Sequence, residues 1–230
     1  MQKFFQITIA SKLALLRVVM SILITVILVI GLCPQEVAAA LAYKKVVVID
    51  AGHGGWDPGK VGESHTPEAE INLAIAKELQ ALLELGGAIV FLTRAEDLAL
   101  ADTKNADLIA RAAMPKDMFA DIFISIHQNA YHDKGVHGAQ VFYYEDSAES
   151  QKLAEAVQEG MRNFLDKDNK KEAKGNDNYF LLRKTQTPAI IVECGFLTNE
   201  DEGARLTKPD YQRKVAWGVY LGLLEYFEVS

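Results

Sequence analysis

Short apolar runs alternate along most of this sequence with longer stretches of amphipathic periodicity. Four stretches show the 3.6-residue periodicity of helices: residues 68–85, 107–114, 147–165 and 209–227. Six short runs rich in β-branched and aliphatic residues are typical of buried strands: residues 45–50, 88–93, 121–126, 139–144, 179–182 and 189–193. Strands that alternate with helices predict an α/β domain whose largely parallel sheet is covered by helices on both faces.

Two segments between these elements are expected to be loops. Residues 51–62 contain five glycines and a proline, and residues 166–178 are polar and charged. Pro115 is expected to end the helix that precedes it, since proline lacks the N–H that a helix interior needs.

The first forty residues have the layout of an export signal. Residues 18–32 form a fifteen-residue run without charge, basic residues precede it, and small residues that fit an A-x-A cleavage pattern follow. An uncleaved anchor is the main alternative, although fifteen residues fall short of the roughly 20 that span a bilayer; a buried core helix is a third. We therefore predict a signal peptide or N-terminal membrane anchor at residues 1–42, and one exported domain at residues 43–230.

The charge of the chain limits its partners. The formal net charge is −7, and residues 1–43 carry three basic side chains and one acidic one, so the remaining 187 residues carry −9. Such a domain is poorly suited to bind nucleic acid, which depends on Lys and Arg. The two cysteines, Cys33 and Cys194, suggest no disulfide framework, and the apolar surroundings of Cys194 predict a small buried residue.

Polar residues follow three of the predicted strands at the point where each strand ends. Asp50 and His53 follow the first strand, His127 follows the third, and Glu193 follows the last. Function in open α/β sheets gathers at the carboxyl ends of strands, so we expect these side chains to converge.

The five histidines fall into two groups. His65, His132 and His137 lie in polar, loop-like surroundings and are expected at the surface. His53 and His127 each end a buried strand, and each alone is most simply a hydrogen-bonded core residue. Together with a carboxylate, however, two imidazoles form a known catalytic zinc set that leaves a position open for water.

A carboxylate near the start of the first helix is a candidate for the third ligand. On a helical projection Glu68 falls on the apolar stripe with Ile71 and Ile75, whereas Glu70 falls on the polar face with Lys77. A carboxylate aimed into an apolar interface needs a partner, and a metal ion is the strongest one available. The alternative is a first-turn acid that interacts favourably with the helix dipole.

Two further acids end strands. Glu193 could act as the general base beside a metal-activated water, or it could be a structural carboxylate bound to loop amides. Asp50 could orient a ligand histidine from behind.

At these residues the chain resembles the zinc-dependent N-acetylmuramoyl-L-alanine amidases, which release stem peptides from the glycan strands of the cell wall. The resemblance extends over about residues 45–227 and includes LTR at 92–94, FLLR at 180–183 and the final helix. Four motifs in order carry it: VVVIDAGHGGWDPGKVG with His53, EAEINL with Glu68, FISIHQNA with His127, and VECGFLTN with Glu193.

The resemblance implies a fold and a reaction. The fold is a three-layer domain with a mostly parallel, about six-stranded twisted sheet flanked by helices. His53, Glu68 and His127 would bind Zn²⁺, and Glu193 would be the catalytic base for hydrolysis of the amide between N-acetylmuramic acid and L-alanine. Ala51 replaces the proline usual in the family, and the segment after His127 is too short for the inserted helix that blocks the site in some cell-division members.

A short single domain with an export segment and a GAQVFYY strand is most similar to the germination-specific, spore-cortex (CwlD-like) members. That similarity implies a peptidoglycan substrate, a role in cortex maturation through muramic δ-lactam formation or in wall remodelling, and an extracytoplasmic location. Contact with the membrane is expected only through an uncleaved N-terminal segment, and a partner protein in the spore envelope is left open. The competing functions are another zinc peptidase, such as a carboxypeptidase, and a catalytically inactive wall-binding module.

Overall fold

The computed structural model describes residues 42, 44–62 and 65–229, which belong to the second of two compact units in the chain, residues 39–230. The predicted signal peptide or anchor lies outside the described residues except for Ala42. In the part that is described, no helix has both the length and the apolar composition needed to cross a membrane.

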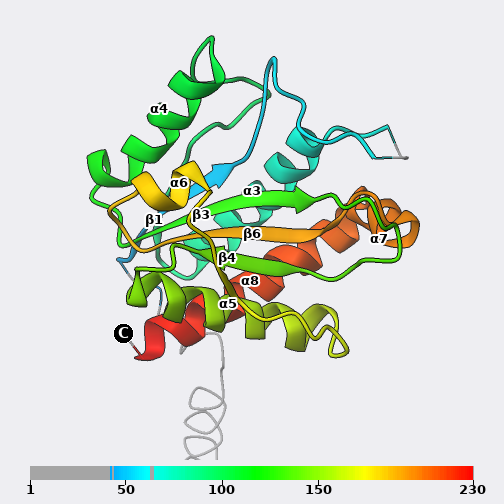
Figure 1. Cartoon of the computed structure of the whole chain (residues 1–230). Coiled ribbons are helices and arrows are strands. Elements are labelled where there is room, and N and C mark those ends of the chain that lie inside the picture. Colours follow the sequence, from blue (N-terminus) through cyan, green and yellow to red (C-terminus); the bar gives the residue numbers. More distant parts are fainter. Residues whose placement is uncertain (1–41, 43, 63–64, 230) are drawn as a thin grey trace, which may run out of the picture. The chain divides into compact units, whose positions relative to one another are not determined.

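One six-stranded sheet runs through the middle of the domain in the order β2-β1-β3-β6-β4-β5 (Figure 1). The strands β1, β2, β3 and β6 are parallel, β4 is antiparallel to β6, and β5 is parallel to β4. The strand bounds are β1 Val46–Ala51, β2 Ile89–Leu92, β3 Ile122–Asn129, β4 Gln140–Tyr143, β5 Lys174–Gly175 and β6 Ala189–Phe196. The sheet is mostly parallel, as predicted.

Helices cover both faces of the sheet, which confirms the three-layer α/β prediction. The helices α3, α5 and α8 pack on one face, and α4 and the short α6 pack on the other (Figure 1). The helix bounds are α3 Glu68–Leu85, α4 Lys104–Asp117, α5 Ala148–Leu165, α6 Phe180–Lys184, α7 Glu200–Leu206 and α8 Pro209–Val229.

Strand alternation divides the core into two clusters. In β1, Val47 and Ile49 belong to the larger cluster on the α3, α5 and α8 side, whereas Val48 belongs to the smaller cluster with residues of α4 and α6. Successive side chains of a strand point to opposite faces of the sheet, so a continuously apolar strand contributes side chains to both core clusters. Burial on both faces fixes the register of β1, β3 and β6, and with it the residues at their carboxyl ends.

The prediction of a strand at residues 179–182 was wrong, because this segment begins helix α6. The run Tyr-Phe-Leu-Leu is apolar enough for a strand, but the side chain of Asn176 accepts hydrogen bonds from the backbone N–H groups of Asn178 and Tyr179. These bonds close a turn that ends just before α6, and within α6 Leu181 and Leu182 pack into the smaller core cluster.

Three other elements differ from the sequence prediction. The expected loop at residues 166–178 contains the two-residue strand β5 at the edge of the sheet, and α7 had not been predicted. Helix α4 continues past Pro115 to Asp117. Pro115 lies in its last turn, where the hydrogen bond that the proline removes is one of the last of the helix.

Candidate active site

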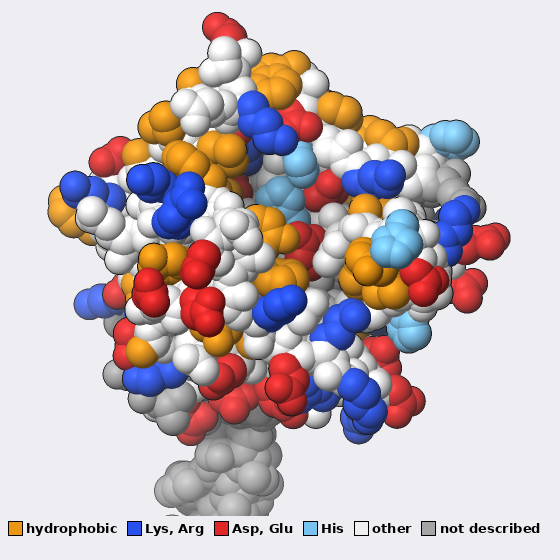
Figure 2. Space-filling model, viewed as in Figure 1, with side chains coloured by type: hydrophobic (Ala, Val, Ile, Leu, Met, Phe, Trp, Pro, Cys, Tyr) orange, Lys and Arg blue, Asp and Glu red, His pale blue; other side chains and the backbone are white. Residues whose placement is uncertain are grey.

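Four of the predicted polar residues line one cleft of about 480 Å³ beside β3, β6 and the segment that follows β1. His53, Glu68, His127 and Glu193 all line it, and Tyr179 also borders it. Figure 2 shows histidine side chains in a hollow near the centre of the face, with Lys and Arg side chains and apolar side chains around it.

Two histidines and one carboxylate converge within this cleft. Glu68 Oε1 lies 2.9 Å from His127 Nδ1 and 3.3 Å from His53 Nε2. One ligand atom from each residue lies within 4.8 Å of the others, so the three side chains could hold a metal ion. The two imidazole rings meet edge to face, with centroids 4.9 Å apart.

Glu68 is held in place by backbone amides as well as by the histidines. Its Oε2 accepts the N–H of Lys60 at 2.9 Å, and its Oε1 accepts the N–H of Gln128 at 3.1 Å. Burial opposes ionisation, but the hydrogen bonds and charges of His127 and His53 outweigh it and hold the pKa of the Glu68 carboxyl well below its usual range. The buried first-turn acid is therefore an anion that faces both histidines.

His53 is oriented by a residue in its own loop. Its Nδ1 lies 2.9 Å from Asp57 Oδ2, which leaves Nε2 to face Glu68. Burial lowers the pKa of His53, but Glu68 and Asp57 together raise it above the ordinary value. A carboxylate behind a histidine fixes the ring and its tautomer, which is the role that the sequence had suggested for Asp50.

Asp50 plays a different part from the one expected. It is fully buried and accepts hydrogen bonds from Thr93, Ser125 and Arg111, and it forms none with a described histidine side chain. The suggestion that Asp50 orients a ligand histidine directly was therefore wrong. Its carboxylate instead forms an ion pair with Arg111, in which Asp50 Oδ1 lies 2.7 Å from Arg111 Nη1.

Arg111 connects this buried charge to the backbone of the first motif. Its guanidinium donates to the carbonyl oxygens of Ala51 and His53, each at 2.8 Å, and also pairs with Asp107. His53 has a φ of 62°, a left-handed conformation that costs energy for a residue other than glycine. The donated hydrogen bond holds the carbonyl of this strained residue.

A second buried arginine supports the same turn. Arg94 donates to the carbonyl oxygens of Ala51, Gly52 and Ala69. The turn also needs a glycine, because a Cβ at Gly52 would lie 2.2 Å from Nε2 of His127. The glycine at this position therefore makes room for the second histidine.

Glu193 lies in the middle of β6, at the position that pairs with His127 in β3. It is 8% exposed, and its Oε2 has no hydrogen-bond partner among the described residues. Burial raises the pKa of Glu193 to about 7 against the opposing charge of His127. Tyr179 borders the same cleft, and its hydroxyl group lowers the pKa of Glu193 in part. A carboxyl with a pKa near neutrality can both accept and return a proton.

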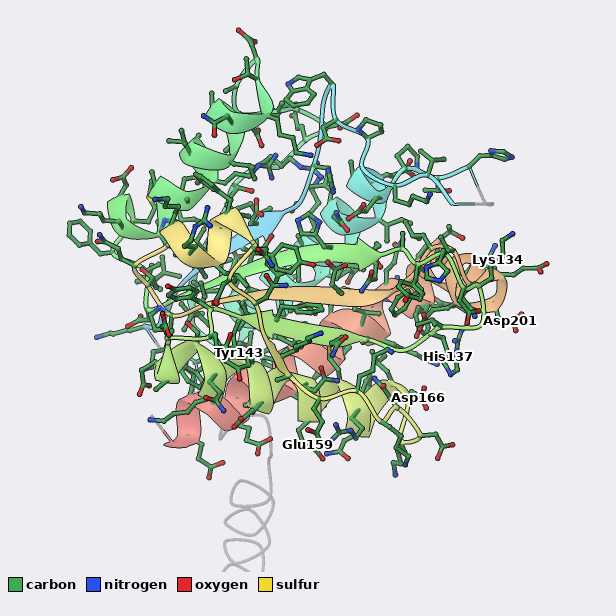
Figure 3. All side chains as sticks on the ribbon, viewed as in Figure 1. Lys134, His137, Tyr143, Glu159, Asp166 and Asp201 are labelled. Atoms are coloured by element: carbon green, nitrogen blue, oxygen red, sulfur yellow. The ribbon has the colours of Figure 1, made fainter. Side chains whose placement is uncertain are left out.

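The remaining predictions about single residues agree with the structure. His65, His132 and His137 are exposed, as is Glu70, and Cys194 is buried. His137 lies with Lys134 and Asp201 at the α7 end of the domain (Figure 3) and does not line the cleft.

Four supporting residues were missed: Asp57, Arg94, Arg111 and Tyr179. Arg94 lies in the LTR motif and Tyr179 directly precedes FLLR. Both motifs belong to the family resemblance, but the sequence assigned no role to either residue.

An open α/β sheet brings two histidines, a buried carboxylate and a second carboxyl with a pKa near neutrality into one cleft, an arrangement that could hold a metal ion and that suits a hydrolase. The sequence profile of the N-acetylmuramoyl-L-alanine amidases matches residues 47–225. The chain belongs to this family and is a peptidoglycan amidase.

Relatives of known sequence and structure agree with this assignment. The chain is 37% identical over 191 residues to the germination-specific N-acetylmuramoyl-L-alanine amidase of Bacillus subtilis (strain 168). The aligned region covers 80% of each protein. The CwlD amidase from Clostridioides difficile, solved in complex with the GerS lipoprotein, is 38% identical with a TM-score of 0.78, over 81% of this chain and all of that one. An N-acetylmuramoyl-L-alanine amidase from Clostridium difficile 630 is 30% identical with a TM-score of 0.72, and the match covers 80% of this chain and 97% of that one.

Proposed function

We propose that the amidase is a zinc enzyme in which His53, Glu68 and His127 hold the ion and Glu193 is the catalytic base. The convergence of three ligand atoms within 4.8 Å supports this most directly. Two imidazole nitrogens and one carboxylate oxygen form a donor set that suits Zn²⁺ and leaves a coordination position open. The depressed pKa of Glu68 supplies the anion that such a site needs.

Zinc, when bound, lowers the pKa of a water molecule from 15.7 to about 7 and polarises a carbonyl group. The residues of the chain then have separate tasks. Glu193 accepts a proton from the attacking water through its unpartnered Oε2 and returns it to the departing amine of L-alanine. Tyr179 lowers the pKa of the Glu193 carboxyl, and Asp57 orients the ring of His53.

The biological role that we propose is maturation of the spore cortex, in which removal of the stem peptide precedes muramic δ-lactam formation. Identity of 37% to a germination-specific amidase supports this role. The CwlD amidase of Clostridioides difficile was solved with the GerS lipoprotein, so we also propose that this enzyme has a protein partner in the spore envelope.

We further propose that residues 1–42 are an export signal or membrane anchor and that residues 43–230 are the catalytic domain, acting outside the cytoplasmic membrane. The uncharged run at 18–32 and its basic flank support this division. N-terminal sequencing of the protein from the producing cells separates the alternatives, since cleavage gives a new terminus near residue 42 and an anchor retains Met1.

The test of the function is digestion of purified peptidoglycan by the full-length protein, with and without a chelator, followed by mass spectrometry. Released stem peptides with a new N-terminal alanine, lost on chelation and restored by Zn²⁺, are the expected result. Release of terminal amino acids alone would contradict the amidase assignment, and full activity in the chelator would contradict the zinc site.

A further inference from the structure

A second hollow adjoins the catalytic cleft between α4 and α6. This α4–α6 groove has a volume of about 500 Å³. Phe180 lines both hollows, and α4 runs beside both, since Lys104 and Leu108 line the cleft whereas Asn105 and Ile109 line the groove. The groove therefore adjoins the cleft along α4, and Phe180 contributes to the wall of each.

The walls of the groove combine apolar surface with cationic and amide groups. Ile109 is 51% exposed and lies with Phe180 on the apolar part. Lys116 and Lys184 are both exposed and line the groove together with the amides of Asn105 and Gln186, and no described acidic side chain lines it. A ligand with short aliphatic segments, amides and free carboxylates complements such a lining.

The part of the catalytic cleft that adjoins the groove is also positively charged. Lys60 and Lys104 line the catalytic cleft, next to the groove. In residues 44–62 and 65–229, none of the four lysines of the cleft and groove forms an ion pair, although Lys104 does act at longer range on Asp57. The domain as a whole carries a charge of −9, so this positive lining is a local exception. It favours binding of an anionic part of the wall polymer over an uncharged part.

We propose that the α4–α6 groove is the subsite for the stem peptide beyond its L-alanine, with Lys116 and Lys184 binding the free carboxylates of that peptide. The inference rests on the proposed amidase function, because it assumes that the scissile amide lies at the His53–Glu68–His127 cluster. The glycan is uncharged once the lactyl carboxyl is in amide linkage, whereas the stem peptide carries the carboxylates. The peptide is therefore the part of the substrate that the lysines select.

The experiment compares two soluble substrates, muramoyl-L-alanine amide and a muramoyl-tetrapeptide with free carboxylates, on the full-length protein. The double variant Lys116→Glu/Lys184→Glu is expected to raise KM for the tetrapeptide substrate about tenfold. The kcat for both substrates and the KM for the short substrate are expected to stay within about twofold of the wild-type values. The matched control Lys77→Glu/Lys214→Glu makes the same charge change on α3 and α8, which pack on the other face of the sheet, and is expected to change neither KM.

Three outcomes would overturn the subsite: an unchanged KM for both substrates, an equal rise for both, or an equal effect of the control variant. A lysine effect that persists on a tetrapeptide whose carboxylates are amidated would also overturn it. Failure of the amidase proposal looks different, because the wild-type protein would then release no alanine amide from the short substrate.

Discussion

Glu193 pairs with His127 in the ladder between β3 and β6, so the two side chains lie on the same face of the sheet. Adjacent strands lie about 4.8 Å apart, which is close enough for a carboxyl and an imidazole to share a water molecule. The pairing is fixed by strands that are buried on both faces, and it does not depend on a loop. The proposed base is thus positioned by a buried strand pairing in the centre of the sheet.

Glu193→Gln is expected to retain zinc and lose turnover by a factor of about 10² to 10⁴, because the amide cannot accept the proton. The shape of the side chain and the three ligand residues remain. Turnover on muramoyl peptides and zinc content by mass spectrometry check this, with Glu70→Gln on the exposed side of α3 as the matched control. Turnover close to wild type in Glu193→Gln would remove Glu193 from the role of base.

Much of this site could be predicted because strand and helix geometry fix it. His127 and Glu193 end apolar runs that had to be buried, and Glu68 shares the apolar stripe of α3 with Ile71. The periodicity of a helix and the burial of a strand are local properties of the sequence, so the side that each residue faces can be read from its neighbours.

The supporting residues could not be predicted, because their environment is tertiary. Arg111 lies on a helix, where an arginine is usually solvated, and only the packing of α4 over β1 buries it beside Asp50. Asp57 is one of several polar residues in a glycine-rich loop whose path the sequence leaves open. Tyr179 was predicted in a strand, but it directly precedes helix α6, and Leu181 and Leu182 of that helix are buried by tertiary packing.

Arg111→Lys is expected to destabilise the fold by about 2 kcal/mol and to weaken zinc binding. Lysine keeps the charge beside Asp50 but cannot reach the carbonyl oxygens of Ala51 and His53 at the same time. Urea denaturation of the metal-free protein and zinc titration measure the two effects. The control Arg213→Lys, at an exposed pair with Asp210, is expected to change stability by less than about 0.5 kcal/mol. Equal effects of the two variants would contradict the role given to Arg111.

Asp57→Asn is expected to weaken zinc binding at pH 8 by about 10- to 100-fold, because the ring of His53 loses its orienting carboxylate. The pH dependence changes as well. The raised pKa of His53 means that a proton competes with zinc at pH values above its ordinary 6.5, so wild-type affinity falls as the pH drops towards that value. Loss of the Asp57 charge lowers the pKa of His53, so the variant loses less affinity between pH 8 and pH 6. Zinc titrations at both pH values measure this. A variant with wild-type affinity and pH dependence would exclude Asp57 as the orienting residue.

Tyr179→Phe is expected to shift the acid limb of kcat/KM upward by about one pH unit. The hydroxyl of Tyr179 lowers the pKa of Glu193, so its loss raises that pKa above about 7 and leaves more of the Glu193 carboxyl protonated at neutral pH. Activity below pH 7 therefore falls more than activity at pH 8.5, where Glu193 is ionised in both proteins. A pH profile on a soluble muramoyl peptide measures the shift, and Tyr144→Phe, which removes a hydrogen bond to Asp146 outside the cleft, is the control. A uniform loss at all pH values would indicate that Tyr179 shapes the cleft without tuning the base.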